Sequence, residues 1–389
     1  MQARRYYHPP LRLGDIAFYW RMSDLPGRPS PVPDFLPFAF TFDATLGLIV
    51  QERNPRVLEC LETIYREDWN VGYLQEGHAL AEAYGNDVIG FIESVLDPAG
   101  APRVLEIGCG GGYLLSYLRR RGFRVVGIDP SPVAAREAAR LEIEVMPGFY
   151  PTVRPDARVD AVFHYDVLEH VADPVAFLAA HHHDLAAGGV LLIAVPDATE
   201  SIALGDISMV IHEHLNFFDR DSLRRTVEAA GFRVLALEKG GYGGVLYCAA
   251  VADPTQHAAP PDAAALADTE KFDRFCERVE RAVRRFTAFL QRADEAADAP
   301  GFYVPLRAIA YLSTLGRTDG IRFFDDDPGI HGRYFDGFPV PVENFTDLQV
   351  RPASHIFVTS TAFGDRLKEK VLQGVEPQPE VLTLTELLR

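Results

Sequence analysis

The sequence has only four cysteines, and they are far apart: Cys60, Cys109, Cys248 and Cys276. No two of them form a C-x-x-C pair, so the usual zinc spacings are absent and no disulfide framework is indicated. We therefore expect no structural zinc and a reducing compartment, the cytoplasm. The chain also lacks an apolar run of about 18 residues, so no membrane-spanning helix is expected. Residues 1–8 lack the apolar core of a signal peptide.

No block of Lys and Arg offsets the formal net charge of −17. An acidic chain without a basic patch is a poor partner for nucleic acid or for an acidic membrane surface. A small-molecule substrate is compatible with this charge, because a local basic pocket can still hold a phosphate. The 389 residues, 48% of them hydrophobic, predict two or three domains with large cores.

Glycine is concentrated in one short stretch, Val104–Leu115, which reads VLEIGCGGGYLL. An apolar run containing Glu106 leads into glycines, and an apolar helical pattern follows at once. This order predicts a strand, a tight turn and a helix N-terminus, where the backbone can approach a ligand closely. The next apolar run ends at Asp129, where folds of this kind bind ribose hydroxyls. The turn has four glycines: Gly108, Gly110, Gly111 and Gly112.

The glycine spacing, E-x-G-x-G-x-G, differs from the G-x-G-x-x-G spacing of dehydrogenases. It resembles motif I of class I S-adenosylmethionine (SAM) methyltransferases. This resemblance implies SAM as the cofactor, with Glu106 near its amino acid part and Asp129 on its ribose. The cofactor-binding residues that we expect are Glu106, Gly108, Gly110, Gly112, Asp129 and, at the end of the fourth predicted strand, Tyr165.

From Arg103 to Val251 the predicted strands and helices alternate, which indicates a parallel sheet covered by helices on both faces. The region ends with a helix, a strand, a glycine turn and a strand, so the last two strands must form an antiparallel hairpin. A parallel sheet finished by such a hairpin is typical of class I methyltransferases. The predicted strands are Val104–Ile107, Val125–Ile128, Glu144–Met146, Ala161–Tyr165, Val190–Val195, Phe232–Leu237 and Val245–Val251.

We predict an α/β, Rossmann-like protein of four segments. Residues 1–80 form an N-terminal cap rich in proline and aromatic residues, and residues 81–252 form the SAM-binding domain. Residues 253–299 are a linker and an amphipathic helix, and residues 300–389 form a small C-terminal α/β domain, because strand and helix patterns alternate there again.

These segments together resemble bacterial C-methyltransferases that act on nucleotide-linked 4-keto deoxysugars. Those proteins have a zinc module, a SAM domain and a C-terminal α/β domain. Phe323–Val342 resembles the family's run of acids, glycines and prolines, and Leu46–Gln51 resembles the end of the zinc module without its cysteines. The family's glycine- and lysine-containing turn is Val304–Arg307 here, and its substrate-loop tyrosine is Ile211. The resemblance implies methyl transfer to carbon of a nucleotide-linked keto sugar. O- or N-methylation of another small metabolite and a non-catalytic SAM-binding scaffold are the alternatives.

Methyl transfer to carbon or to a hydroxyl needs a base above the carboxyl ends of the strands. The segments Tyr165–His170 and Ile211–Phe218 follow the fourth and fifth strands and supply such groups. No metal is expected, because H-x-E-H differs from the H-E-x-x-H spacing of zinc proteases. The triplet at 181–183, near a helix C-terminus, is expected to be structural. The resemblance implies four catalytic residues: His214 as the base, Glu213 beside it, His170, and Tyr73 over the substrate. His212, two residues from His214, is a substitute candidate for the base.

Overall fold

The structure, a computed structural model, describes residues 8–18, 21–67, 79–208, 210–241, 244–253, 263–361 and 363–389. The chain divides into two compact units, each built from segments that are distant in the sequence. The first unit contains Thr41–Thr199 and His214–Thr269, together with His8. The second unit contains Pro9–Phe40, Glu200–Glu213 and Glu270–Arg389.

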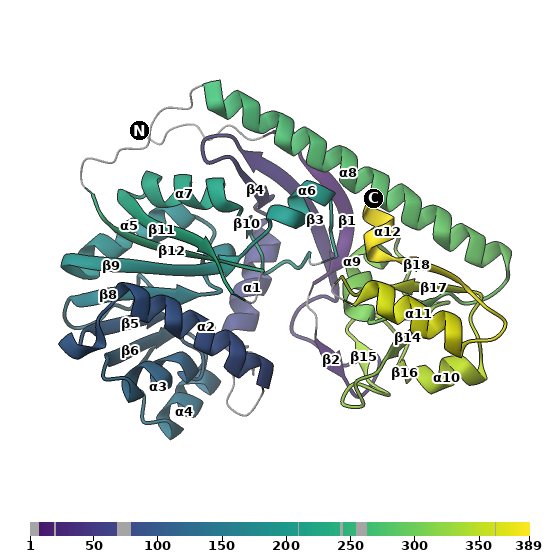
Figure 1. Cartoon of the computed structure of the whole chain (residues 1–389), viewed down its shortest axis with the longest axis horizontal. Helices are drawn as coiled ribbons and strands as arrows, with labels where there is room; N and C mark the ends of the chain where they lie inside the picture. The colour runs from purple at the N-terminus through teal and green to yellow at the C-terminus, as the bar shows by residue number, and fades with distance from the viewer. Residues whose placement is uncertain are drawn as a thin grey trace. The chain divides into compact units, whose positions relative to one another are not determined.

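The first unit is built on a seven-stranded sheet with the order β11-β12-β9-β8-β5-β6-β7 (Figure 1). The strands from β9 to β7 are parallel to their neighbours, whereas β12 is antiparallel to both β9 and β11. The predicted parallel sheet with an antiparallel terminal hairpin is therefore confirmed. The strands are β5 (Arg103–Ile107), β6 (Arg124–Asp129), β7 (Val145–Pro147), β8 (Val159–Tyr165), β9 (Leu185–Pro196), β11 (Phe232–Lys239) and β12 (Val245–Ala252).

Helices cover both faces of this sheet, as Figure 1 shows. Side chains alternate along β5: Leu105 and Ile107 join one core, with residues of α5 and α7, and Val104 joins the other, with residues of α2 and α3. A strand buried on both faces is mostly apolar, which explains Val104, Leu105 and Ile107 in β5 and makes the buried Glu106 an exception. The helices are α2 (Ala79–Val95), α3 (Tyr113–Arg120), α4 (Pro132–Arg140), α5 (Pro174–Asp184) and α7 (Arg220–Ala229).

Two of these helices begin where their capping residues predict. Ser131 precedes Pro132, and its hydroxyl oxygen accepts the Ala134 N–H at 3.2 Å at the start of α4. Asp173 precedes Pro174 in the same way at the start of α5. A polar cap followed by proline satisfies a free N–H and fixes the first helical φ angle. The helix patterns in the sequence predict the ranges Pro132–Arg140 and Pro174–Leu185. The first range is met by α4, and the second differs from α5 by one residue at its end.

A shorter strand pair and a helix complete the first unit. The strand β4 (Leu48–Gln51) pairs antiparallel with β10 (Asn216–Phe217), from the long segment after β9. Helix α1 (Pro55–Glu67) follows β4. The pairing of β4 with β10 brings the residues just before Asn216 to a defined position, which is important for the site.

The second unit contains a five-stranded, entirely parallel sheet with the order β16-β14-β13-β17-β18. The predicted helix from 306 to 315 starts there as a 3₁₀ turn (Pro305–Ala308) before α9. Its elements are β13 (Gly301–Tyr303), α9 (Ile309–Thr314), β14 (Arg322–Asp325), β16 (Val342–Asn344), α10 (Phe345–Val350), β17 (His355–Val358), α11 (Gly364–Gly374), β18 (Glu380–Thr383) and α12 (Leu384–Leu388).

Other elements pack within the second unit. The long helix α8 (Ala263–Glu295) has the predicted aromatic stripe, and Phe286 packs against Tyr311 with ring centroids 5.4 Å apart. Two antiparallel strand pairs also belong to this unit. The strands of the first pair are separated by a proline-rich segment, and those of the second are distant in the sequence. They are β1 (Leu11–Ala17) with β3 (Phe35–Asp43), and β2 (Met22–Ser23) with β15 (Tyr334–Phe335). Helix α6 (Thr199–Leu204) starts at the boundary between the units.

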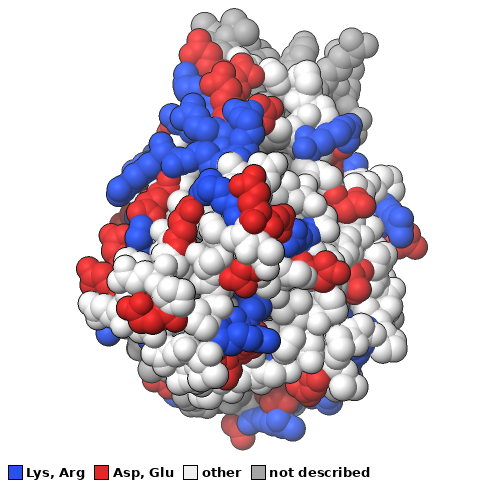
Figure 2. Space-filling model, turned by 90° about the vertical axis from the view of Figure 1, so that its right-hand side faces the viewer, with Lys and Arg blue, Asp and Glu red and all other residues white. Residues whose placement is uncertain are grey.

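On the face drawn in Figure 2, Lys and Arg side chains are interspersed with Asp and Glu side chains. Ion pairs between partly exposed side chains also occur in the structure, such as Arg317 with Asp294 at 2.9 Å. Mixed signs of this kind produce little long-range attraction for a polyanion.

None of the helices in the described ranges is both long enough and apolar enough to cross a membrane.

Candidate functional site

The glycine turn after β5 has backbone angles that residues with a side chain rarely adopt. Gly108, Gly110 and Gly112 have φ angles of 71°, 49° and 75°, in the left-handed region. Space is also limited at Gly108, because an added Cβ would lie 2.5 Å from Cγ2 of Val167. Val167 belongs to the segment after β8, so the glycine turn and that segment are in close contact.

Asp129, at the end of β6, holds this turn in place. Its Oδ2 accepts the N–H of Gly110 at 2.8 Å, and its Oδ1 accepts the N–H of Ser131 at 2.8 Å. Burial raises the pKa of Asp129, whereas the two N–H bonds lower it. Each carboxylate oxygen can accept a second hydrogen bond, so Asp129 can brace the turn and still bind a ribose. The ribose contact stays a prediction.

Glu106 lies inside β5, with only 3% of its surface exposed. Among the described residues its Oε2 has no hydrogen-bond partner. Burial, and then the charge of Asp129, raise its pKa well above the usual value. Burying a carboxyl without a hydrogen-bond partner costs free energy, and a bound ligand would lower this cost by supplying a partner. The ammonium group of the amino acid part of SAM suits it, because a positive charge beside the carboxyl would favour the ionised form. The residues present therefore fit this cofactor.

The end of β8 has a strained residue that was not predicted as part of the site. Tyr165 is partly buried against the sheet core, and the next residue, Asp166, has a φ angle of 52°. Its N–H donates to the carbonyl of Ala194 at 3.0 Å. Burial raises the pKa of Asp166 to about 7. A non-glycine residue in this conformation is uncommon and often marks a functional site. The available sequence clue was an acid directly after a parallel strand.

Three side chains that can donate a lone pair converge beyond Asp166. Glu169 and His170 lie in a 3₁₀ turn (Leu168–His170), and His214 lies just before β10. One donor atom from each lies within 4.8 Å of the other two. The rings of His170 and His214 have centroids 5.2 Å apart, and Glu169 Oε1 is 3.6 Å from His170 Nε2. The structure thus brings together His170 and His214, two of the histidines selected from the sequence.

Burial, and then the charge of His170, lower the pKa of His214 to about 3. This imidazole is therefore neutral at pH 7. The other histidine has a polar neighbour from α1, since the Tyr65 hydroxyl lies 3.3 Å from His170 Nδ1. Tyr65 orients the His170 ring and leaves Nε2 on the side of Glu169.

Backbone and side-chain bonds tie the two segments of this cluster together. The N–H of Leu215 donates to the carbonyl of Glu169 at 2.7 Å, and Asn216 Nδ2 donates to the carbonyl of Val171 at 2.8 Å. Arg53, which follows β4, donates from Nη1 to the carbonyl of Leu215 at 2.7 Å and from Nη2 to Asn216 Oδ1 at 2.8 Å. No sequence spacing indicated these roles for Arg53 and Asn216.

Two other residues selected from the sequence, Glu213 and His212, do not lie in this cluster, and a third lies outside the described residues. Glu213 belongs to the second unit and is not one of the three converging groups. His212 has structural contacts within the second unit, where its Nε2–H donates to the carbonyl of Leu36 at 3.1 Å and its ring packs edge-on against Phe38. Tyr73 lies outside the described residues.

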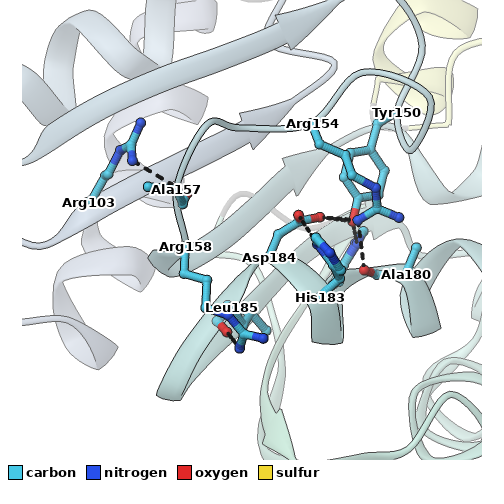
Figure 3. A network of polar contacts seen from close by, with 10 residues as sticks. Arg103, Tyr150, Arg154, Ala157, Arg158, Ala180, His183, Asp184 and Leu185 are labelled. Carbon is cyan, nitrogen blue, oxygen red and sulfur yellow. Dashed lines mark hydrogen bonds and ion pairs between the residues drawn. The ribbon is translucent and has the colours of Figure 1, made fainter.

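The histidine triplet at 181–183 takes part in a polar network beneath the sheet, part of which Figure 3 shows. The hydroxyl of Tyr150 and Nη1 of Arg154 both donate to Asp184 Oδ2 at 2.6 Å. His183 Nδ1 lies 3.0 Å from Asp184 Oδ1, and His181 Nδ1 lies 3.0 Å from the Tyr150 hydroxyl. These bonds give His181 and His183 a structural role, and His182 Nε2–H donates to the carbonyl of Ala230 at 2.8 Å, at the end of α7.

Known proteins resemble the central part of this chain. Residues 77–237 match the family model described as a methyltransferase domain. The chain is 31% identical over 172 residues to a ubiquinone biosynthesis O-methyltransferase of Dinoroseobacter shibae, which covers 39% of this chain and 66% of the relative. It is 29% identical over 173 residues to the protein of the same name from a Methylobacterium species, which covers 40% of this chain and 68% of the relative. The chain thus spans about two thirds of each relative.

Solved structures also resemble it. The structure titled "DhpI-SAH complex structure" covers 52% of this chain and 100% of its own, at 21% identity and a TM-score of 0.40. The sheet order, the glycine turn and the family match define residues 77–237 as a class I methyltransferase domain with a Rossmann-like fold. The cofactor of this domain is S-adenosylmethionine.

Proposed function

We propose that the chain is an enzyme that transfers a methyl group from SAM to a small-molecule acceptor above the carboxyl edge of the seven-stranded sheet. One observation carries the proposal. The cofactor groups follow β5 and β6, and the cluster of Glu169 and His170 with His214 follows β8 on the same edge. Val167, in the segment after β8, packs closely against Gly108, so the cofactor groups and the cluster are adjacent.

SAM supplies an electrophilic methyl group on a sulfonium, which becomes a neutral thioether as the methyl leaves. The acceptor forms the new bond to the methyl carbon and loses one proton. The chain positions both reactants, excludes water and activates the acceptor. His170 and His214 are the activating groups, Glu169 orients them, and Asp129 fixes the turn on which the cofactor lies.

The acceptor that we favour is a carbon next to the keto group of a nucleotide-linked sugar. The order of segments supports it, because a class I methyltransferase domain is followed by a parallel α/β sheet in a second unit. In this proposal Glu213 and Tyr73 lie at the sugar. An oxygen acceptor is the second candidate, because the curated relatives of the central domain are named O-methyltransferases.

One experiment separates these acceptors. The protein is incubated with SAM and either nucleotide-linked 4-keto sugars or phenolic hydroxyl compounds, and products are identified by mass. With a keto sugar in deuterated water, a carbon acceptor exchanges its α-proton without SAM turnover, whereas a hydroxyl acceptor leaves no carbon-bound deuterium. Methylation of neither class by protein that binds SAM would contradict the proposed activity and favour a SAM-binding scaffold.

A further inference from the structure

We infer that Glu169, His170 and His214 hold a divalent transition-metal cation beside the acceptor position. Their donor atoms come from two segments and all lie within 4.8 Å of one another. Ligand atoms about 2.1 Å from a zinc-like ion lie at most about 4.2 Å apart. Each side chain therefore needs to move by less than about 1 Å to complete the site.

The donor set selects the kind of cation. Two imidazoles with one carboxylate suit Zn²⁺, Fe²⁺, Mn²⁺ or Co²⁺ better than Ca²⁺ or Mg²⁺, which prefer oxygen ligands. Three protein ligands also leave coordination positions open for a substrate atom, as in catalytic zinc sites. Among the described residues this cluster offers three protein ligands, whereas a structural zinc site usually has four.

The surroundings prepare His170 as a ligand. The Tyr65 hydroxyl lies 3.3 Å from Nδ1, and Glu169 Oε1 lies 3.6 Å from Nε2. In the tautomer whose Nδ1–H donates to Tyr65, Nε2 offers its lone pair on the side of Glu169, where a cation would bind both atoms. A polar partner on the second ring nitrogen is also the usual arrangement around a metal-bound histidine.

His214 comes from the second segment of the cluster, just before β10. Its ring centroid lies 5.2 Å from that of His170, and one of its ring nitrogens lies within 4.8 Å of the donor atoms of the other two residues. The two imidazoles therefore approach one position from different segments of the chain.

The segments that carry the ligands are already held in place. Leu215 bonds to the backbone of Glu169, and Arg53 and Asn216 bridge the two segments. Such bracing reduces the ordering that a cation would otherwise have to impose. From the sequence alone, H-x-E-H gave no complete ligand set, because two of the ligands lie more than forty residues upstream of His214.

This inference rests on the proposed function and narrows its substrate class. A Lewis-acidic cation at this place would bind an acceptor oxygen and make the acceptor more acidic. The acceptor would then be a hydroxyl that is itself methylated, or a ketone whose neighbouring carbon is methylated. An amine acceptor without such an oxygen would gain nothing from the cation.

Direct binding tests the site without relying on turnover. The whole protein is stripped with a chelator, dialysed, and titrated with CoCl₂ by visible absorption and with ZnCl₂ by calorimetry. We expect one tight cation per chain in the wild type. Glu169→Gln, His170→Asn and His214→Asn should each weaken it by at least about 10–100-fold. The matched control is His183→Asn, because His183 is exposed on α5 and should leave the affinity unchanged. SAM calorimetry on every variant checks that the fold is intact.

Two results would overturn the inference: no stoichiometric site in the wild type, or ligand variants that bind as tightly as His183→Asn. Undiminished methyl transfer by chelator-treated protein would also overturn the role of the cation, and it would leave the proposed function intact. Conversely, a metal-loaded protein that neither binds SAM nor methylates any acceptor would contradict the proposed function, while the cation site would stand.

Discussion

His164, in β8, should make the protein sensitive to acid. It has no exposed surface, and among the described residues neither of its ring nitrogens has a hydrogen-bond partner. Its ring contacts Phe177 and His181, with centroids 5.5 and 5.7 Å away. Burial lowers its pKa from 6.5 to about 3, because a charged imidazole in this core would have no compensating partner.

Proton linkage decides whether acid raises or lowers the free energy of unfolding. The unfolded chain binds a proton at His164 below a pH of 6.5, whereas the folded protein does not until a pH of about 3. The contribution of His164 to stability is therefore fully present above a pH of 6.5. It declines as the pH falls below 6.5 and is lost once the pH falls through about 3. Between pH 7 and pH 5 this one group should lower the free energy of unfolding by about 2 kcal/mol.

The variant that isolates this effect is His164→Leu, which keeps an apolar side chain of similar volume and removes the titrating group. Urea unfolding, followed by far-ultraviolet circular dichroism, gives the free energy of unfolding at pH 7 and at pH 5. The advantage of the variant over the wild type should be about 2 kcal/mol larger at pH 5. His183→Asn, which removes an exposed histidine from α5, should show no such gain. An equal difference between variant and wild type at both pH values would refute the reasoning.

Four further changes test the site. Asp129→Ala should weaken SAM binding by about 1–3 kcal/mol in calorimetry, because it removes the acceptor for two turn N–H groups and for the ribose. Gly108→Ala should also weaken SAM binding, and adding Val167→Ala should recover only part of the loss, because the positive φ angle persists. Arg53→Ala should lower turnover more than SAM affinity, because the two segments of the cluster lose their bridge. His214→Ala should reduce turnover by about 10²–10⁴-fold with SAM affinity nearly constant; normal turnover would limit His214 to a structural role.

Local sequence rules predicted the first unit well, because its elements follow from short-range chemistry. Pro132 after Ser131 fixes the start of α4, and β5 is rich in apolar residues because both of its faces are buried. The hairpin of β11 and β12 follows from a glycine turn between two apolar runs. Short strands such as β18 were missed, since four residues, Glu380–Thr383, give little periodicity to detect.

Predicting the site required knowledge of contacts between distant segments as well as of local sequence patterns. Glycine spacing indicated the cofactor turn, because a left-handed backbone limits the residue type. The meeting of His170 with His214 is set by the β4–β10 pair and by hydrogen bonds from Arg53 and Asn216. Those contacts join segments 45 or more residues apart, and none has a characteristic spacing. A sequence motif can therefore select the histidines, but the pairing of distant strands decides whether they act as separate bases or as one ligand cluster.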